Sequence, residues 1–231
     1  MSSPATLFQT LNLIAITCAA LAGSTAARRR GLDPVGILCC ACITGLGGGL
    51  IRDVLLQDGV PASIANPWNP AAAFAAGAVL CFAAPRGVAW RVLAPVAEAV
   101  TIGAWAVTGT EKAAALGVAS FSSVLLGVVS AVGGGAVRDV VVLRRVPEIF
   151  GGNTLTATCA AASAAVMITA YRLQCPQAGL AGGTAIGGIL YLVARRRHWI
   201  LPSALRSQAE PPGDASAAAT EPARPSANPN T

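Results

Sequence analysis

The chain has 231 residues, of which 11% are charged and 54% hydrophobic, and its mean hydropathy is +0.62. Soluble domains carry about 25% charged residues, so this composition excludes an ordinary water-exposed surface and predicts a protein of the lipid bilayer. The formal net charge is +6, but aromatic residues make up only 5% and do not interleave with basic residues, which argues against nucleic acid as a partner.

Apolar segments along the chain predict transmembrane helices, because each approaches the length of about 20 residues that a span needs. In chain order they cover about 7–27, 34–57, 70–85, 92–110, 117–143, 152–171 and 178–194. No positive charge precedes the first segment, so we interpret it as a retained span and not as a signal peptide. The predicted fold class is an all-α membrane protein with seven transmembrane helices.

Arginine is concentrated in every second connection between these segments, around 28–30, 86–91, 144–145 and 195–197. Short loops rich in Lys and Arg stay in the cytoplasm, so we expect a multi-pass protein of the cell membrane with its N-terminus outside and its C-terminus in the cytoplasm. Residues 207–231 are mostly Ala, Pro, Ser and Asn, which predicts a disordered cytoplasmic tail after a transmembrane domain at 1–206.

An internal repeat is visible at an offset of 86 positions, where Gly-Gly-Gly-Leu-Ile-Arg-Asp-Val from Gly47 is matched by Gly-Gly-Gly-Ala-Val-Arg-Asp-Val from Gly133. The two copies, about 7–85 and about 92–171, each contain three predicted spans. An odd number of crossings starts the second copy from the opposite side, which predicts two inverted three-helix repeats followed by a seventh helix at about 178–194.

Three consecutive glycines lie within the middle helix of each copy. Glycine costs about 1 kcal/mol relative to alanine inside a helix, so three together predict a break or kink. Irregular backbone at membrane depth needs protein or a water-filled cavity against it, so the break implies a cavity or a tight helix crossing. Close packing of helices rich in small residues is the alternative role for these glycines.

An Arg-Asp doublet follows each glycine triplet, and ionisable residues inside a membrane usually mark a pathway or a pair. We expect the two aspartates to bind N–H groups freed by the break. Adjacent helix positions do not face each other, so we expect the arginines to reach carbonyls or another carboxylate. Glu98 either lines the pathway or lies hydrated near the interface. The candidate pathway residues are Gly47, Gly48, Gly49, Arg52, Asp53, Glu98, Gly133, Gly134, Gly135, Arg138 and Asp139.

Other polar residues are interpreted as structural. Cys39, Cys40 and Cys42 point apart on a helix and have no converging His, so we expect small core residues and no metal site. Asp33 before Pro34 predicts a helix N-cap. His198 lies between Arg and Trp and is interpreted as an interfacial anchor.

The doubled Gly-Gly-Gly-x-x-Arg-Asp motif resembles the prokaryotic trimeric intracellular cation (TRIC) channels, a family also labelled glycine transporters. The resemblance covers roughly residues 7–200. It implies a homotrimer with one cation pathway in each subunit, no cofactor and no enzymatic turnover. Two positions depart from the family pattern: Glu98 stands where Asp is expected, and Glu111 where Gln is expected in the Gly-x-x-Lys-Ala stretch.

Two functions remain open at this point. The first is a channel for monovalent cations, chiefly K⁺, whose glycine breaks present carbonyl oxygens to a partly dehydrated ion. The second is a secondary transporter of glycine or a similar zwitterion, in which arginine binds the carboxylate and aspartate the ammonium group. The resemblance favours the channel.

Overall fold

The computed structural model describes residues 4–83, 88–147, 155–197 and 199, and all secondary structure in these ranges is helical. The helices are α1 (Pro4–Arg29), α2 (Pro34–Leu56), α3 (Ala62–Ala65), α4 (Trp68–Phe82), α5 (Val88–Ala115), α6 (Ser120–Val137), the π-helix η1 (Arg138–Val142), α7 (Thr156–Arg172) and α8 (Pro176–Arg196). The predicted all-α class is confirmed.

Five described helices are long and apolar enough to cross a membrane: α1, α2, α5, α8 and the continuous segment of α6 and η1. The other two predicted spans correspond to α4 and α7, which have 15 and 17 residues. At about 1.5 Å per residue, α4 is shorter than the about 30 Å hydrocarbon core. The five long apolar helices show a multi-pass membrane protein, while the count of seven spans stays a prediction.

Several boundaries differ from the predicted ones. The third predicted segment begins two residues earlier, at Trp68, and the short helix α3 before it was not predicted. Residues 84–87, which include the end of that segment, lie outside the described part of the chain, as do 152–154, His198 and the tail at 207–231.

Local sequence explains where the helices begin and end. Asp33 Oδ1 accepts a hydrogen bond of 2.7 Å from the Gly36 amide, which confirms the predicted N-cap of α2. At the end of α1, the Arg28 guanidinium donates to the carbonyl oxygens of Leu80 and Ala83. A cation at the C-terminal end of α4 is favourable for the helix dipole and joins α1 to α4.

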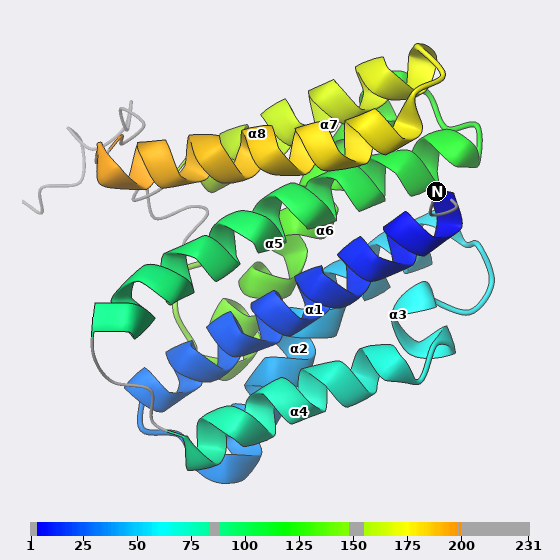
Figure 1. The fold of residues 1–231 in the computed structure, drawn as a ribbon. Helices are drawn as coiled ribbons and strands as arrows, with labels where there is room; N and C mark the ends of the chain where they lie inside the picture. Colours follow the sequence, from blue (N-terminus) through cyan, green and yellow to red (C-terminus); the bar gives the residue numbers. More distant parts are fainter. Residues whose placement is uncertain (1–3, 84–87, 148–154, 198, 200–231) are drawn as a thin grey trace, which may run out of the picture. The chain divides into compact units, whose positions relative to one another are not determined.

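The helices pack in two similar groups. α1, α2 and α4 contact one another, α5, α6 and α7 contact one another in the same order, and α8 packs on α5 and α7 (Figure 1). Alanine dominates the contacts, and Trp105 of α5 is the largest fully buried side chain in the described chain. Small residues let the backbones approach closely, which is how membrane helices gain packing energy without a hydrophobic driving force.

The predicted helix break at the glycine triplets is wrong. α2 is an unbroken α-helix through Gly47–Gly49, and α6 remains α-helical through Gly133–Gly135 up to Val137. The irregularity follows the second triplet, where the backbone becomes the π-helix η1. The helix continues through each triplet because glycines, which have no side chain, let α2 and α6 cross closely. The packing gained at this crossing offsets the low helix propensity of glycine.

This crossing joins the two repeats by related contacts. A Cβ on Gly48 of α2 would overlap the backbone oxygen of Ser130 in α6, and a Cβ on Gly134 would lie 2.5 Å from the backbone oxygen of Thr44. Gly134 and Ser130 are the counterparts of Gly48 and Thr44 at the repeat offset of 86 positions. Since Thr44 meets Gly134 while Gly48 meets Ser130, the two helices run antiparallel, as inverted repeats require.

We predict that Gly48→Ala destabilises the protein by about 1–3 kcal/mol, because the added methyl group meets backbone and not a flexible side chain. Gly182→Ala is the matched control, since a Cβ on Gly182 meets nothing within 4 Å. It should leave stability unchanged or raise it by up to about 1 kcal/mol. Thermal unfolding of purified protein in detergent measures both; equal melting temperatures would contradict the close crossing.

Candidate functional site

A cavity of about 100 Å³ lies beside the glycine crossing, inside a single chain. Its wall comes from α1, α2, α5, α6, η1, α7 and α8, and we call it the central cavity. Polar groups in the wall include the hydroxyls of Thr44, Thr101 and Ser130. Thr44 and Thr101 donate hydrogen bonds to carbonyls of their own helices, at 2.7 and 2.8 Å. Their oxygen lone pairs therefore remain able to accept a proton donor or a cation.

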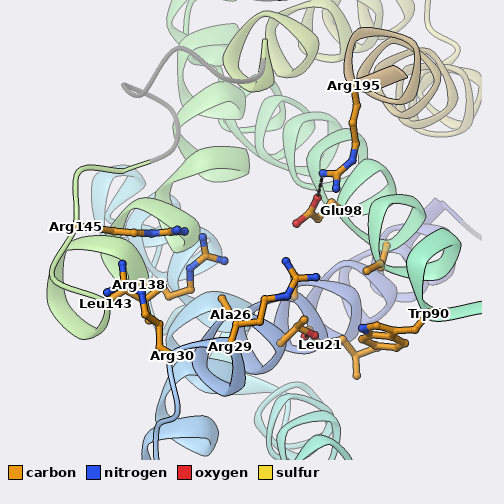
Figure 2. Close-up of a pocket in the computed structure, with 14 residues that line it drawn as sticks. Leu21, Ala26, Arg29, Arg30, Trp90, Glu98, Arg138, Leu143, Arg145 and Arg195 are labelled. Atoms are coloured by element: carbon orange, nitrogen blue, oxygen red, sulfur yellow. Dashed lines mark hydrogen bonds and ion pairs between the residues drawn. The ribbon is translucent and has the colours of Figure 1, made fainter. Parts of the chain in front are cut away.

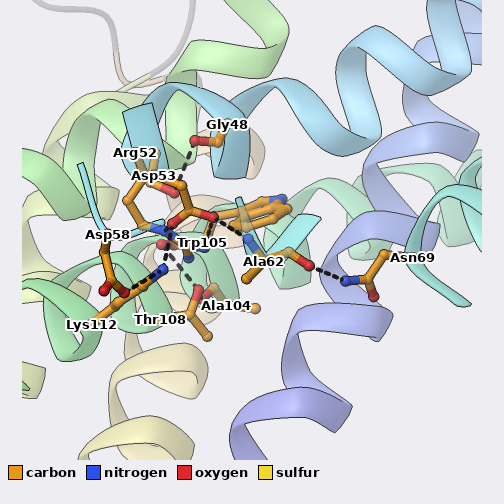
Figure 3. A network of polar contacts seen from close by, with 11 residues as sticks. Gly48, Arg52, Asp53, Asp58, Ala62, Asn69, Ala104, Trp105, Thr108 and Lys112 are labelled. Carbon is orange, nitrogen blue, oxygen red and sulfur yellow. Dashed lines mark hydrogen bonds and ion pairs between the residues drawn. The ribbon is translucent and has the colours of Figure 1, made fainter. Parts of the chain in front are cut away.

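A buried ion cluster lies next to the crossing, at the C-terminal end of α2. Arg52 Nε donates to Asp53 Oδ1 at 2.8 Å, and both side chains are fully buried. Lys112 of α5 contacts Asp53 Oδ1 at 3.0 Å and Asp58 Oδ2 at 3.2 Å (Figure 3). Asp53 Oδ2 also accepts from the Ala62 amide, so α3 is held against α2. Two cations and two carboxylates thus neutralise one another.

Trp105 connects this cluster to the central cavity. Its ring lines the cavity, and the Arg52 guanidinium carbon lies 5.8 Å from the ring centroid, within cation–π range. Glycine at position 49 makes room for the indole, because a Cβ there would lie 2.9 Å from Trp105. The Trp105 ring therefore lies in the cavity wall with the Arg52 guanidinium close to it.

A second ion cluster follows α6. Arg138 Nη2 and Arg145 Nη2 both contact Asp139 Oδ1, at 2.7 and 3.0 Å, and Asp139 is 1% exposed. The π-helix places Arg138 and Asp139 in the wall of the central cavity. In both doublets the arginine bonds the adjacent aspartate, so the expectation that neighbouring positions do not pair is wrong. The long arginine side chain folds back along the helix and reaches the carboxylate that its backbone position does not face.

Glu98 lines the central cavity and is held by α8. Its Oε2 accepts hydrogen bonds from Tyr191 Oη at 2.7 Å and from Arg195 Nη1 at 3.1 Å. Glu98 is also part of the wall of a second pocket of about 170 Å³, which we call the basic pocket. Figure 2 shows the Glu98–Arg195 pair at its edge and the guanidinium groups of Arg29, Arg138 and Arg145 directed toward the same space.

A third pocket, of about 720 Å³, lies beyond the Arg52 cluster and is bordered by Lys112. We call it the amide pocket, because its polar wall contains the amide side chains of Gln9, Asn12, Asn66 and Asn69 in addition to Glu111. The basic pocket shares Glu98 and Arg138 with the central cavity, while Lys112 and Trp105 separate the cavity from the amide pocket.

The basic and amide pockets are counterparts under the internal repeat. Five residues of the amide pocket map, at the offset of 86 positions, onto residues of the basic pocket. These are Phe8, Asn12, Glu111, Lys112 and Ala115, which correspond to Ala94, Glu98, Thr25, Ala26 and Arg29. The repeat therefore places the two polar pockets at opposite ends of α1 and α5, and of the two only the basic pocket shares wall residues with the central cavity.

The structure brings six of the predicted site residues into the wall of the central cavity: Gly48, Gly134, Gly135, Glu98, Arg138 and Asp139. Arg52 and Asp53 are not in this wall, and Arg52 approaches it only through the ring of Trp105. Gly47, Gly49 and Gly133 serve in helix contacts, with Gly134, Trp105 and Ile51 respectively. The sequence did not predict the roles of Trp105, Tyr191 and Arg195, which lie far along the chain from the glycine motifs. The one signal in the sequence was the repeat offset, which pairs Asn12 with Glu98, the residue that Tyr191 and Arg195 hold.

Comparison with known proteins identifies the family. A family model described as Glycine transporter matches residues 9–86 and 95–172. The inner membrane protein YadS of Escherichia coli K12 is 26% identical over 84% of this chain and 94% of its own length.

Solved structures share the fold. A TRIC cation channel studied for its conductance is 30% identical, with a TM-score of 0.73 over 84% of this chain and 96% of that one. The trimeric intracellular cation channel orthologue of Rhodobacter sphaeroides has a TM-score of 0.75 at 24% identity, over 83% of this chain and 98% of that one. The chain therefore belongs to the membrane protein family described as glycine transporters, and its fold is that of the TRIC cation channels.

Proposed function

We propose that the protein is a channel for monovalent cations, chiefly K⁺, with one path through each subunit. The observation that carries this proposal is the central cavity formed within one chain, which shares Glu98 and Arg138 with the basic pocket, together with the amide pocket at the opposite end of α1 and α5. The likeness to a TRIC cation channel at 30% identity supports cations as the conducted ions. In this reading the path runs from the amide pocket past Lys112 and Trp105 into the central cavity, and leaves beside Arg138 and Glu98.

Hydroxyl groups, and not freed carbonyls, supply the oxygen ligands in this path. Because α2 and α6 stay helical through the glycines, the carbonyls there remain engaged along the helix. Thr44, Thr101 and Ser130 line the central cavity and can accept an ion at their lone pairs. The glycines contribute by bringing the two helices close beside this ring of hydroxyls.

The ion clusters act as two gates. Arg52 and Lys112 are balanced by Asp53 and Asp58, whereas Arg138 and Arg145 share Asp139, so the described pairs neutralise the charge at the first cluster and leave guanidinium in excess at the second. Removing one partner of a buried ion pair leaves the other charge buried and uncompensated, which typically costs about 3–5 kcal/mol of stability. Opening must therefore move each pair as a unit or replace its contacts with water and the passing ion.

A glycine carrier is the less favoured alternative. It needs a free aspartate for the substrate ammonium group, whereas Asp53 and Asp139 already accept contacts from two basic side chains each. The assembly we propose is a homotrimer in the cell membrane with seven spans per subunit, in keeping with the trimeric orthologue of the same fold and the inner membrane location in the name of YadS.

We predict that Arg138→Ala keeps or raises K⁺ flux in liposomes, because it removes a positive charge from the path. Asp139→Asn should lower K⁺ flux, since it leaves Arg138 and Arg145 without their shared carboxylate. In a carrier the same Arg138→Ala would weaken glycine uptake by about 10-fold or more, through loss of a charge-assisted contact.

Flux of K⁺ and of radiolabelled glycine is measured side by side on the same preparation. The channel is contradicted if Arg138→Ala abolishes K⁺ flux in protein that elutes as a folded oligomer. It is equally contradicted if the natural sequence exchanges glycine with saturation and shows no K⁺ conductance.

The orientation is tested by cysteine labelling in a background without the seven native cysteines. Leu173, between α7 and α8, and Arg196, at the end of α8, are both exposed. Leu173→Cys should react with an impermeant thiol reagent added to intact cells, and Arg196→Cys only after permeabilisation, since arginine-rich loops stay in the cytoplasm. The reverse pattern would overturn the proposed orientation.

A further inference from the structure

The amide pocket contains buried oxygen atoms that lack hydrogen-bond partners. Asn12 of α1 is 4% exposed, and its Oδ1 has no hydrogen-bond partner among the described residues. The same is true of the buried Oε2 of Glu111 in α5. Both residues line the amide pocket. Leaving a buried polar group unbonded costs about 1–3 kcal/mol, so two acceptors in one place call for a donor or a cation.

Lys112, the nearest basic residue in sequence, does not neutralise Glu111. Its ammonium group lies between Asp53 and Asp58, at 3.0 and 3.2 Å. With Arg52 included, that cluster holds two cations and two carboxylates, which balance. Among the described residues of this region, the Glu111 carboxyl group is thus the acidic group beside the pocket without an ion-pair partner.

A third oxygen comes from α4. Asn69 is 4% exposed and lines the same pocket. Its Nδ2 donates to the Ala62 carbonyl oxygen at 2.9 Å, which fixes the amide and leaves Oδ1 as an acceptor only (Figure 3). Carboxylate and amide oxygens from α1, α4 and α5 therefore surround one pocket. Such oxygens coordinate alkali cations and accept hydrogen bonds from primary ammonium groups.

The basic pocket contains a carboxylate whose oxygen is satisfied by protein donors. Glu98 corresponds to Asn12 under the repeat, and its Oε2 is satisfied by Tyr191 and Arg195. Both partners come from α8, which follows the two repeats and has no counterpart in them. At the amide pocket no described helix supplies such a partner to Glu111 Oε2, so an external cation can take that place.

We infer that the amide pocket is a binding site for one monovalent cation, held by Glu111, Asn12 and Asn69 with water completing its shell. The ligand is an alkali ion or a primary ammonium group, which present the same charge to the same oxygens. This inference deepens the proposed channel function, on which it rests for its role, by giving the path a first binding site at one entrance.

The test uses full-length protein in detergent and measures its melting temperature against increasing KCl, with choline chloride replacing KCl at constant ionic strength. Methylammonium chloride is the second arm, because choline carries its charge inside a shell of methyl groups that these oxygens cannot approach closely. We expect KCl or methylammonium chloride, relative to choline chloride, to raise the melting temperature with saturation. The more effective salt identifies the source of the cation.

Glu111→Gln keeps the shape of the side chain and removes its charge. We expect it to raise the apparent dissociation constant by about 10-fold or more, since a charge-assisted contact is lost. Asn12→Leu should weaken binding in the same direction. Gln9→Leu is the matched control, because Gln9 borders the same pocket but is exposed and has no buried unpartnered oxygen. It should bind as the natural sequence does.

The inference is overturned if neither salt stabilises the protein beyond choline chloride, or if Glu111→Gln responds as the natural sequence does while remaining a folded oligomer. Liposome flux separates this failure from that of the proposed function. Binding that depends on Glu111 in a protein without K⁺ flux refutes the channel and keeps the site. K⁺ flux with binding unaffected by Glu111→Gln refutes the site and keeps the channel.

Discussion

The approach of α2 to α6 at their glycines is the constraint on which the rest of the site depends. With a side chain at Gly48 or Gly134, the backbone oxygens of Ser130 and Thr44 would be overlapped, and the two repeats could not meet at this distance. The same contact sets Thr44 and Ser130 in the cavity wall and lets both Arg-Asp doublets leave the crossing in opposite directions along antiparallel helices. A membrane protein gains little from apolar burial between helices, so close small-residue contact must supply much of the cohesion.

Charge pairing is the second requirement, because the doublets lie among apolar helices. Arg52 and Asp53 are both fully buried, and each would be costly alone. The partners differ between the repeats: Asp53 takes Lys112 from α5, whereas Asp139 takes Arg145 from its own connection. The first cluster therefore ties the repeats together, while the described pairs of the second lie within one repeat.

The repeat, the all-helical class and the Asp33 cap followed from the sequence because each depends on local periodicity or on a short motif. The predicted helix break at the glycines was wrong. The cost of glycine within a helix is local, whereas the compensating contact of Gly48 is with Ser130, which lies 82 positions away in the chain. Trp105 beneath Arg52 and the α8 partners of Glu98 were missed for the same reason. Composition reveals that a buried charge needs a partner but not which distant helix provides it.

The helix α8, which lies outside the repeats, makes the molecule asymmetric. Symmetry alone would make its two pockets alike, yet Arg29 stands in the basic pocket where the amide pocket has Ala115, and α8 adds Arg195 there. Glu98 is consequently engaged by α8, while Glu111 in the amide pocket retains an oxygen without a hydrogen-bond partner in the described part of the chain. The asymmetry that α8 introduces therefore gathers guanidinium groups in the basic pocket and leaves a carboxyl group in the wall of the amide pocket.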